Sequence, residues 1–404
     1  MLNKPKIPHQ AVLSVLRSYG LPSAEATFLP SGDSNSAVYR VTGGGIRYFL
    51  KLRCGDFDEI ATTVPAYLHS KGIIRVMAPI PATTGQPWTR SHGFDWMLYP
   101  FFQGKNGFER PLSQANWIAL GETMRRVHEI ILPPQLARRV PQVSYAAQYR
   151  TIVKVLDRQV ADRRSFDDEV AAQVAEFWTK NRGDIRTVVE RAEQLAEKMR
   201  GRAGALVLCH SDLHAGNVLV GVDDALRVVD WDNPIFAPKE RDLMFVGGGI
   251  GGAWNDPRES GWYFTGYGPA EIDPIAIAFF RYERMVVDIA EYGQRMLTYK
   301  IAGAIGYRAC ASSRLRSSPT TLSIWPTSPI RTFRKGALNP IGDVAFRCDC
   351  LLSEGDSNPQ DPSGFDGRNS FPVWRTIRPE KKTSVLERAC SPGIRLFFRS
   401  LRFP

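Results

Sequence analysis

Four polar residues with a fixed spacing are the strongest candidates for chemistry in this sequence. His210, Asp212 and Asn217 lie in a polar loop between two short apolar runs, and Asp230 ends a further apolar run thirteen residues after Asn217. This spacing is typical of a loop that catalyses phosphoryl transfer. One aspartate orients the attacking hydroxyl and accepts its proton, while the asparagine and second aspartate hold Mg²⁺ at the nucleotide phosphates. We therefore expect Asp212 to be the catalytic base, with Asn217 and Asp230 as metal ligands.

A simpler interpretation of the same loop is an ordinary hairpin between two strands. His-x-Asp pairs occur by chance, so His210 could be a packed core histidine and Asp212 a turn residue. The joint occurrence of four polar residues in register, with strand-like runs on both sides, favours the catalytic interpretation. In that interpretation His210 belongs to the catalytic set as the residue that braces the loop.

At these positions the chain resembles the aminoglycoside phosphotransferase and choline kinase-like family, a small-molecule branch of the protein-kinase fold. The shared hallmark is the loop followed by an Asp-x-Asp segment, here Asp230-Trp231-Asp232. The resemblance extends over roughly residues 20–295. It is nearest to aminocyclitol (spectinomycin-type) phosphotransferases, through that segment and the glycine-rich run after Asp242, a residue that we expect to support the loop structurally.

The resemblance implies an α+β, protein kinase-like bilobal fold. A small N-terminal lobe with an antiparallel sheet and one helix is expected to bind nucleotide over residues 1–99. A mainly helical lobe over residues 100–297 would carry the catalytic loop and the acceptor site. Apolar periodicity agrees, because it predicts helices over 8–20, 56–71, 112–131 and 279–291, and a mostly helical region over 145–200.

A lysine within a strand-like run is the candidate for nucleotide binding. Lys51 lies in the run 46–52, after the tight turn 42–45, and its neighbours Leu50 and Leu52 are residues that favour burial. A buried ammonium needs an anionic partner, and kinase-like folds place a lysine on the third strand at the phosphates. The alternative is a surface lysine at a strand edge, but the catalytic loop downstream favours the phosphate role.

Two further residues are expected near the nucleotide on weaker grounds. Ser34 lies in the small polar turn 31–36, which offers hydroxyl and backbone donors to a phosphate, as many ordinary hairpin turns also do. Glu59 is the only glutamate in the predicted helix 56–71, where kinases present a glutamate to the strand lysine. An acid in the first helical turn is also favoured by the helix dipole alone, and Pro65 is expected to shift or kink this helix.

The strand-like run 94–102 is expected to link the two lobes. In the resembled family the equivalent stretch binds adenine through backbone groups. Pro100 has no N–H, so Tyr99 or Phe101 would supply the amide donor. The density of aromatic residues in this run also suits a core strand with a purely structural role.

The resemblance implies ATP and Mg²⁺ as cofactors and transfer of a phosphoryl group to a hydroxyl of a small molecule, most simply an aminoglycoside or aminocyclitol. Such acceptors are cationic, and Glu283, Asp288 and Glu291 are candidate partners for them. A metabolic kinase for choline, homoserine or a sugar is the alternative enzyme. A nucleotide-binding pseudokinase is the alternative from another class.

Composition limits the remaining possibilities. The 404 residues are 43% hydrophobic and 23% charged, as in soluble globular proteins. No apolar run approaches the roughly 18 residues that a membrane-spanning helix needs, and the N-terminus lacks the apolar core of a signal peptide. Of the net charge of +11, residues 301–404 carry +8. We therefore expect a cytoplasmic protein whose partner is a small hydroxyl acceptor, with no nucleic acid and no membrane.

The region from about residue 297 onward differs from the rest of the chain. Helical periodicity stops there, and ten prolines occur between Pro319 and Pro404. Prolines at this frequency exclude long helices and central strands. We expect residues 298–404 to be a disordered or out-of-frame tail that contributes nothing to the active site, the alternative being a basic appendage that binds nucleic acid or membrane.

Overall fold

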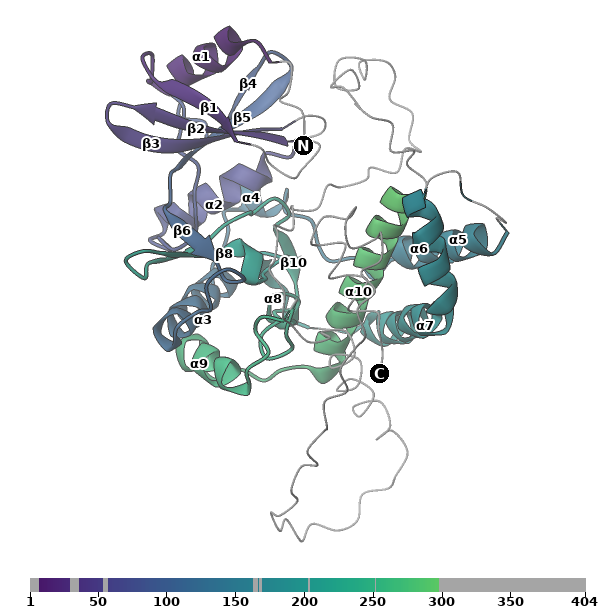
Figure 1. Ribbon diagram of the computed structural model, residues 1–404. Helices are drawn as coiled ribbons and strands as arrows, with labels where there is room; N and C mark the ends of the chain where they lie inside the picture. Colours follow the sequence, from purple (N-terminus) through teal and green to yellow (C-terminus); the bar gives the residue numbers. More distant parts are fainter. Residues whose placement is uncertain are drawn as a thin grey trace.

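The computed structural model describes residues 7–29, 36–53, 57–162, 166, 169–202, 204–250 and 252–297. The region expected to form a tail, 298–404, and the turn 31–35 that contains Ser34 lie outside the described residues. The described chain combines an antiparallel sheet near its N-terminus with a mainly helical C-terminal part, which confirms the expected α+β class (Figure 1). None of its helices is long and apolar enough to cross a bilayer.

The N-terminal sheet has five strands, and every neighbouring pair is antiparallel. The strands follow the order β1-β2-β3-β5-β4. Gly44 and Gly45 both have positive φ between β2 and β3, as a two-residue hairpin turn requires, so the predicted tight turn is confirmed. The strands are β1 (Glu25–Leu29), β2 (Ser36–Gly43), β3 (Ile46–Arg53), β4 (Thr89–Ser91) and β5 (Phe94–Pro100).

The two faces of this sheet have different neighbours because side chains alternate along a strand. Leu50 and Leu52 of β3 are buried with Trp96 of β5 in a smaller core beneath helix α1 (His9–Ser18). Lys51, between the two leucines, therefore points to the opposite face, which looks toward the rest of the molecule (Figure 1).

Helix α2 (Ile60–Ser70) begins later than predicted and contributes to a second, larger core. Its buried Ile60, Val64 and Leu68 pack with the helical part of the chain. Pro65 lies inside the helix, and Gly72 follows it with a φ of 79°, the left-handed conformation that ends a helix. Among the described helices, α1 is the one that contributes buried residues to the smaller core of the sheet. The predicted boundary between the two lobes at residue 99 stays a prediction.

Two helices of the larger core cross at unusually close range. Helix α3 (Gln114–His128) lies against α9 (Pro257–Tyr267), and a Cβ built at Gly121 or Gly266 would overlap the backbone of the other helix. Both helices begin with a capping box, at Ser113 and Asp256 respectively, which satisfies their first backbone N–H groups. Their position fixes His128 beneath the catalytic loop.

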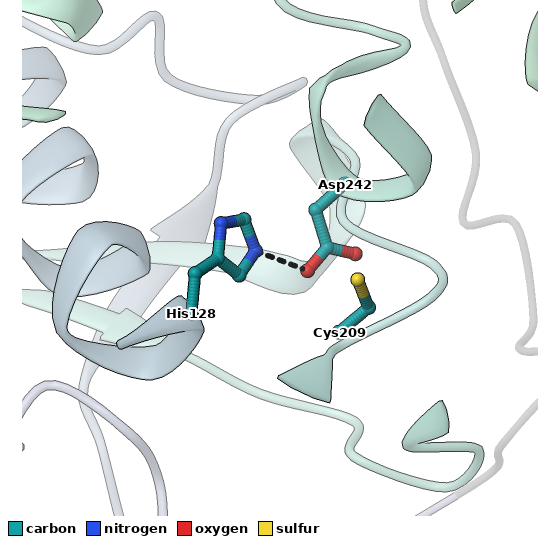
Figure 2. A group of neighbouring side chains, drawn as sticks. All are labelled: His128, Cys209 and Asp242. Carbon is teal, nitrogen blue, oxygen red and sulfur yellow. Dashed lines mark hydrogen bonds and ion pairs between the residues drawn. The ribbon is translucent and has the colours of Figure 1, made fainter. Parts of the chain in front are cut away.

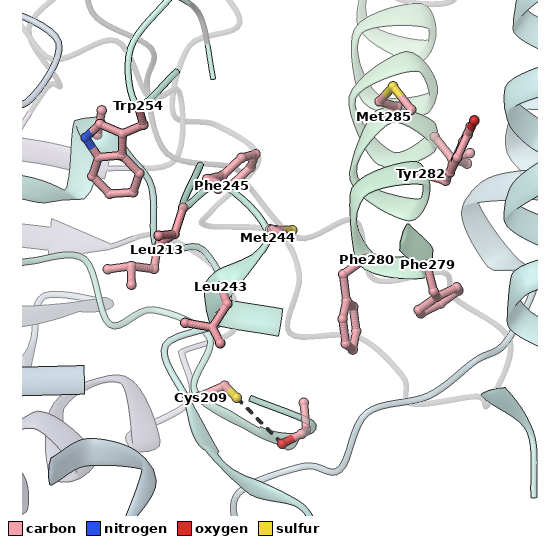
Figure 3. Packing of buried hydrophobic residues seen from close by; sticks show 14 of the residues in the cluster. Cys209, Leu213, Leu243, Met244, Phe245, Trp254, Phe279, Phe280, Tyr282 and Met285 are labelled. Carbon is pink, nitrogen blue, oxygen red and sulfur yellow. Dashed lines mark hydrogen bonds between the residues drawn. The ribbon is translucent and has the colours of Figure 1, made fainter. Parts of the chain in front are cut away.

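The C-terminal helices form a second layer of the larger core, with α10 (Pro274–Leu297) beside α5, α6 and α7 (Figure 1). Figure 3 shows part of this core, where Leu243 and Met244 lie between Leu213 of the catalytic loop and Phe280 of α10. The remaining helices are α4 (Pro134–Ala137), α5 (Gln148–Asp162), α6 (Glu169–Lys180), α7 (Arg182–Met199) and α8 (Glu240–Leu243).

Two small antiparallel sheets frame the polar loop of the sequence motif. The first has the order β6-β8-β9 and the second pairs β7 with β10. The predicted apolar runs on either side of the loop are therefore strands, which hold the ends of the loop rigidly. The elements are β6 (Gly104–Asn106), β7 (Val207–Cys209), the short helix η1 (Ala215–Asn217), β8 (Val218–Gly221), β9 (Leu226–Val228) and β10 (Ile235–Ala237).

Candidate active site

His210 follows β7 and is completely buried. Its Nε2 lies 2.9 Å from the Val229 carbonyl oxygen, and its ring packs edge-on against Trp231 with 4.7 Å between centroids. Its Nδ1 accepts the backbone N–H of Asp212 at 3.3 Å. Both ring nitrogens are thus occupied by backbone groups, and His210 ties the loop to the segment that carries Asp230, as expected of a brace.

Asp242 holds the start of the loop from below. Its carboxylate accepts the backbone N–H groups of His210 and Ser211, each at 2.8 Å, and lies 3.1 Å from Nε2 of His128 (Figure 2). Ser211 has a φ of 72°. This left-handed conformation costs about 1–3 kcal/mol and persists only where the surrounding structure enforces it. Burial raises the pKa of Asp242, but His128 and the backbone donors outweigh this and lower it.

The group in Figure 2 also includes Cys209, and its geometry is that of a structural network. The Oδ2 atom of Asp242 already accepts two hydrogen bonds, and Nδ1 of His128 lies 2.7 Å from the Tyr267 hydroxyl. The Cys209 thiol lies 3.7 Å from the Ala237 carbonyl oxygen. All three side chains therefore have hydrogen-bond partners within the protein, and the expected supporting role of Asp242 is confirmed.

Asp212 lies one residue beyond this frame, and its side chain is 20% exposed. One carboxylate oxygen, Oδ1, pairs with the guanidinium of Arg284 from α10, and Oδ2 lies 3.6 Å from Nε2 of His214. Burial alone would raise the pKa of Asp212, but Arg284 and His214 outweigh it and hold that pKa well below its usual range. The carboxylate is therefore ionised near neutral pH and can accept a hydrogen bond from an acceptor hydroxyl.

Asn217 and Asp230 are brought together at the ends of two strands. The backbone N–H of Val229 donates to the Asn217 carbonyl at 2.9 Å, which places Asp230 beside Asn217. The side-chain Nδ2 of Asn217 donates to the Asp212 carbonyl at 2.8 Å, so Oδ1 is the end of the amide available to a cation. A carboxylate and an amide oxygen suit Mg²⁺, which takes one or two carboxylates and completes its shell with water and substrate phosphates.

Asp230 also has strained backbone, with a φ of 66°. Aspartate tolerates the left-handed region better than most residues, but the conformation remains uncommon outside glycine. Strain of this kind persists only where the surrounding structure enforces it. Here the hydrogen bond from Val229 to Asn217 fixes the residue before Asp230. The backbone conformation of Asp230 then sets the direction in which its side chain leaves the chain.

Lys51 reaches from β3 to the segment that follows β9. Its Nζ lies 3.4 Å from Asp230 Oδ1 and 3.2 Å from Asp232 Oδ2, and Arg53 Nη1 lies 3.1 Å from the same Asp232 oxygen. Burial would lower the pKa of Lys51, but the two aspartates outweigh this and raise it. The ammonium is therefore charged at any physiological pH. It lies beside the two acids that follow the polar loop.

The expected ion pair between Lys51 and Glu59 is not formed. Lys51 pairs with the two aspartates instead, while the Glu59 carboxylate pairs with Arg139 and lies 3.4 Å from Nε1 of Trp88. The reason is the position of α2, whose first residue is Ile60, so that Glu59 lies at the N-cap and not on a helix face. Asp232 provides the carboxylate that we expected from Glu59.

Comparison with known proteins identifies the family of this chain. Residues 25–280 match the family model described as the phosphotransferase enzyme family. The chain belongs to this family. It is a small-molecule phosphotransferase that acts on hydroxyl groups, and the resemblance expected from the catalytic loop is confirmed. No curated protein matches the sequence significantly.

Solved structures of a phosphotransferase in this family are similar to the chain over most of their length. Spectinomycin phosphotransferase APH(9)-Ia, solved with ADP and spectinomycin, is 34% identical, and the match covers 73% of this chain and 89% of that one with a TM-score of 0.68. Its AMP-bound complex gives 35% identity, coverages of 72% and 90%, and a TM-score of 0.66. A microcompartment-associated aminopropanol kinase, at 14% identity, coverages of 72% and 90% and a TM-score of 0.50, shares the fold alone.

Three expected nucleotide contacts of this phosphotransferase remain predictions. Ser34 lies outside the described residues. The backbone N–H of Phe101 donates to the Arg47 carbonyl at 3.3 Å, so it is already engaged in this structure. Tyr99 lies on the same face of the sheet as Lys51. Burial raises the pKa of its phenol while Lys51 acts to lower it.

The sequence interpretation missed Arg284, which contacts Asp212, the expected base of the phosphotransferase. It lies within the predicted helix 279–291, four residues before Asp288, and this spacing places both side chains on one helix face. The pairing of Arg284 with Asp288 was therefore foreseeable from the sequence. Its contact with Asp212, 72 positions away, depends on how α10 packs and left no local signal.

Proposed function

We propose that this phosphotransferase transfers the γ-phosphoryl group of ATP, with Mg²⁺, to a hydroxyl of an aminocyclitol of the spectinomycin type. The choice of nucleotide is supported by the solved relatives, which contain ADP or AMP. The choice of acceptor is supported by spectinomycin in the relative that is 34% identical to this chain and 89% covered by it.

One structural observation carries the proposal. Lys51 from the N-terminal sheet and Asp230 from the segment after β9 meet at 3.4 Å, although they are 179 positions apart in the chain. Asn217 links the two aspartates indirectly: its carbonyl accepts the backbone N–H of Val229, which precedes Asp230, and its Nδ2 donates to the Asp212 carbonyl. The site thus combines three groups that phosphoryl transfer requires: a cation for the phosphates, oxygen ligands for a divalent ion and an ionised base.

The residues divide the work in the following way. Asp212 accepts a hydrogen bond from the acceptor hydroxyl and orients its oxygen toward the γ-phosphorus. As the new P–O bond forms, the bond from the γ-phosphorus to the oxygen that bridges it to the β-phosphate breaks, ADP leaves, and Asp212 takes the proton of the hydroxyl. Lys51 binds the α- and β-phosphates, and Asn217 and Asp230 hold Mg²⁺. When bound, Mg²⁺ neutralises charge on the phosphate oxygens. The rate then depends on positioning and charge stabilisation, because the transferred group itself needs little covalent assistance.

A second candidate acceptor is favoured by the charges on α10. Two of the acids expected to bind a cationic acceptor are paired with arginines: Glu283 lies 3.6 Å from Arg150, and Asp288 lies 3.1 Å from Arg284. A carboxylate that is already neutralised attracts a cation less strongly. This arrangement suits an acceptor with fewer positive charges, such as a sugar or homoserine.

The test is a transfer assay with a panel of acceptors. The full chain is incubated with ATP and Mg²⁺ and, in separate reactions, spectinomycin, other aminocyclitols, aminoglycosides, choline, homoserine and simple sugars, and each acceptor is analysed by mass spectrometry. We expect one phosphoryl group on spectinomycin, and none with Asp212→Asn. Transfer only to a sugar or homoserine would favour the second candidate. Nucleotide binding without transfer to any acceptor would identify a pseudokinase and contradict both.

A further inference from the structure

The proposed function assigns no role to Arg284, although this residue contacts the proposed base Asp212. Its guanidinium lies between two carboxylates: Nη1 pairs with Asp212 Oδ1, and Nε lies 3.1 Å from Asp288 Oδ1. The Arg284 side chain is only 14% exposed, against 34% for Asp288. A guanidinium with this much burial needs partners that satisfy it, and the two carboxylates supply them.

The Arg284 contact defines the orientation of the base. Asn217 Nδ2 fixes the Asp212 backbone through its carbonyl, but nothing in that bond restricts the side-chain torsion. Arg284 supplies the missing restraint by engaging Oδ1, which leaves Oδ2 as the oxygen that faces His214 at 3.6 Å. A base that acts mainly by orienting a hydroxyl needs such a restraint, because a shift of about 1 Å is enough to cost roughly 10²-fold in rate.

The helix that carries Arg284 is well placed to act as a fixed support. One turn earlier, Arg281 Nε donates to the Met244 carbonyl at 2.7 Å, which ties α10 to the segment after Asp242. Phe280 and Val286 of α10 are both buried in the larger core, which holds the helix in place. Asp288 lies one turn beyond Arg284, where an acid and an arginine four residues apart stabilise one another.

We propose that Arg284 is a positioning residue for the base, and that Asp288 in turn orients Arg284. The relay Asp288–Arg284–Asp212 sets one oxygen of the base and presents the other to the acceptor hydroxyl. This inference rests on the proposed function for its kinetic consequence, whereas its structural consequence is independent of it. The competing possibility is that Arg284 merely occupies the acceptor site and is displaced when a cationic acceptor binds.

The kinetic test compares Arg284→Ala, Arg284→Lys and Asp288→Asn with wild type, using ATP, Mg²⁺ and spectinomycin. Arg284→Ala should lower turnover by roughly 10²-fold while ATP affinity stays unchanged, and Arg284→Lys should retain more turnover. Guanidinium ion, below concentrations that unfold the protein, should restore part of the turnover of Arg284→Ala. Arg186→Ala removes an exposed arginine of α7 that pairs with Asp157 of α5; this variant is the control and should behave as wild type.

Three results would overturn the proposal. Unchanged turnover in Arg284→Ala removes the kinetic role. A lower KM for spectinomycin with turnover preserved shows that Arg284 is an occupant that the acceptor displaces. Equal losses in Arg284→Ala and Arg284→Lys, with reduced thermal stability and no recovery by guanidinium, show a structural role only.

A crystal structure of the Arg284→Ala variant separates this proposal from the proposed function. The relay requires the Asp212 carboxylate to change its torsion when Arg284 is truncated, and to keep it in Arg284→Lys. An unchanged Asp212 torsion in Arg284→Ala contradicts the relay whatever the turnover. If wild type transfers no phosphoryl group to any acceptor, the proposed function fails, and the change in torsion still decides the relay.

Discussion

The two charged clusters of the site are assembled in different ways. At the proposed nucleotide end, Lys51 belongs to the sheet over the smaller core and reaches Asp230 and Asp232, which follow a strand of the larger core. At the proposed acceptor end, Asp212 and Arg284 both come from segments of the larger core. The geometry of the proposed acceptor end therefore depends on the packing of the larger core alone. The geometry of the proposed nucleotide end depends on how the sheet and its smaller core are placed against the larger core.

This difference separates two kinds of change. A substitution at the acceptor end should alter turnover without altering nucleotide affinity, since the phosphates contact the other cluster. A substitution at the nucleotide end should alter affinity and turnover together, because the same groups hold the phosphates before and during transfer.

Asp212→Asn should have the largest effect on turnover. The amide keeps the shape of the side chain but cannot accept the proton, and general-base assistance is worth about 10²–10⁴-fold. Turnover with ATP and acceptor should fall by that factor, while ATP affinity measured by calorimetry stays the same. Turnover close to wild type would remove Asp212 from the mechanism.

Asp242→Ala should remove the hydrogen bonds that hold the start of the polar loop and should thereby lower the stability of the protein. The change leaves the backbone N–H groups of His210 and Ser211 and the ring of His128 without their buried partner. At about 1–3 kcal/mol for each of these three unsatisfied groups, the free energy of unfolding should fall by roughly 3–9 kcal/mol in chemical denaturation. Asp223→Ala, in the turn between β8 and β9, is the control. Equal stability of the two variants would show that the Asp242 network does not hold the loop.

Lys51→Met should weaken nucleotide binding and leave the fold intact. The apolar stem remains, and only the charge is lost. A hydrogen bond to a charged group is worth about 1.5–3 kcal/mol, so ATP affinity should fall roughly 10- to 100-fold. Lys154→Met, which removes an exposed lysine paired with Glu193, should bind ATP like wild type. The same affinity in both variants would make Lys51 an ordinary strand lysine.

Glu59→Gln should have the smallest effect. Glu59 pairs with the partly exposed Arg139 and does not contact Lys51, and such pairs contribute about 0–1 kcal/mol. ATP affinity should therefore stay within roughly fivefold of wild type, whereas Asp232→Asn should reduce it more. A larger loss of ATP affinity in Glu59→Gln than in Asp232→Asn would instead support the pair between Glu59 and Lys51 that the sequence predicted.

The placement of the polar loop between strands and of Lys51 on the third strand was predictable because both are specified by the local sequence pattern. The polar residues of the loop are fixed by spacing between strands, and Lys51 is fixed by alternation with Leu50 and Leu52. The partner of Lys51 was not predictable, since the start of α2 at Ile60 turns Glu59 away. Helix boundaries depend on packing that the sequence pattern specifies poorly, and here a shift of a few residues changed the partner.

The contact between Arg284 and Asp212 shows a second limit of sequence reasoning. The sequence indicates that Arg284 and Asp288 share a helix face, but not which loop that face meets. That depends on the crossing of α10 with the loop, which is set by buried contacts such as those of Phe280 and Met244. The same limit affected α2, whose apolar face joined the larger core instead of the N-terminal sheet.

The most direct test of the two-ended site is a paired Mg²⁺ titration of ATP binding in Asp230→Asn and Asp212→Asn, with turnover measured on the same samples. An amide is a poorer ligand than a carboxylate for Mg²⁺. Asp230→Asn should therefore lose most of the Mg²⁺-dependent gain in ATP affinity together with turnover. Asp212→Asn should keep the wild-type titration curve and lose turnover alone. If the two variants give the same titration curve, Asp230 is not a metal ligand and the division of the site into nucleotide and acceptor ends is wrong.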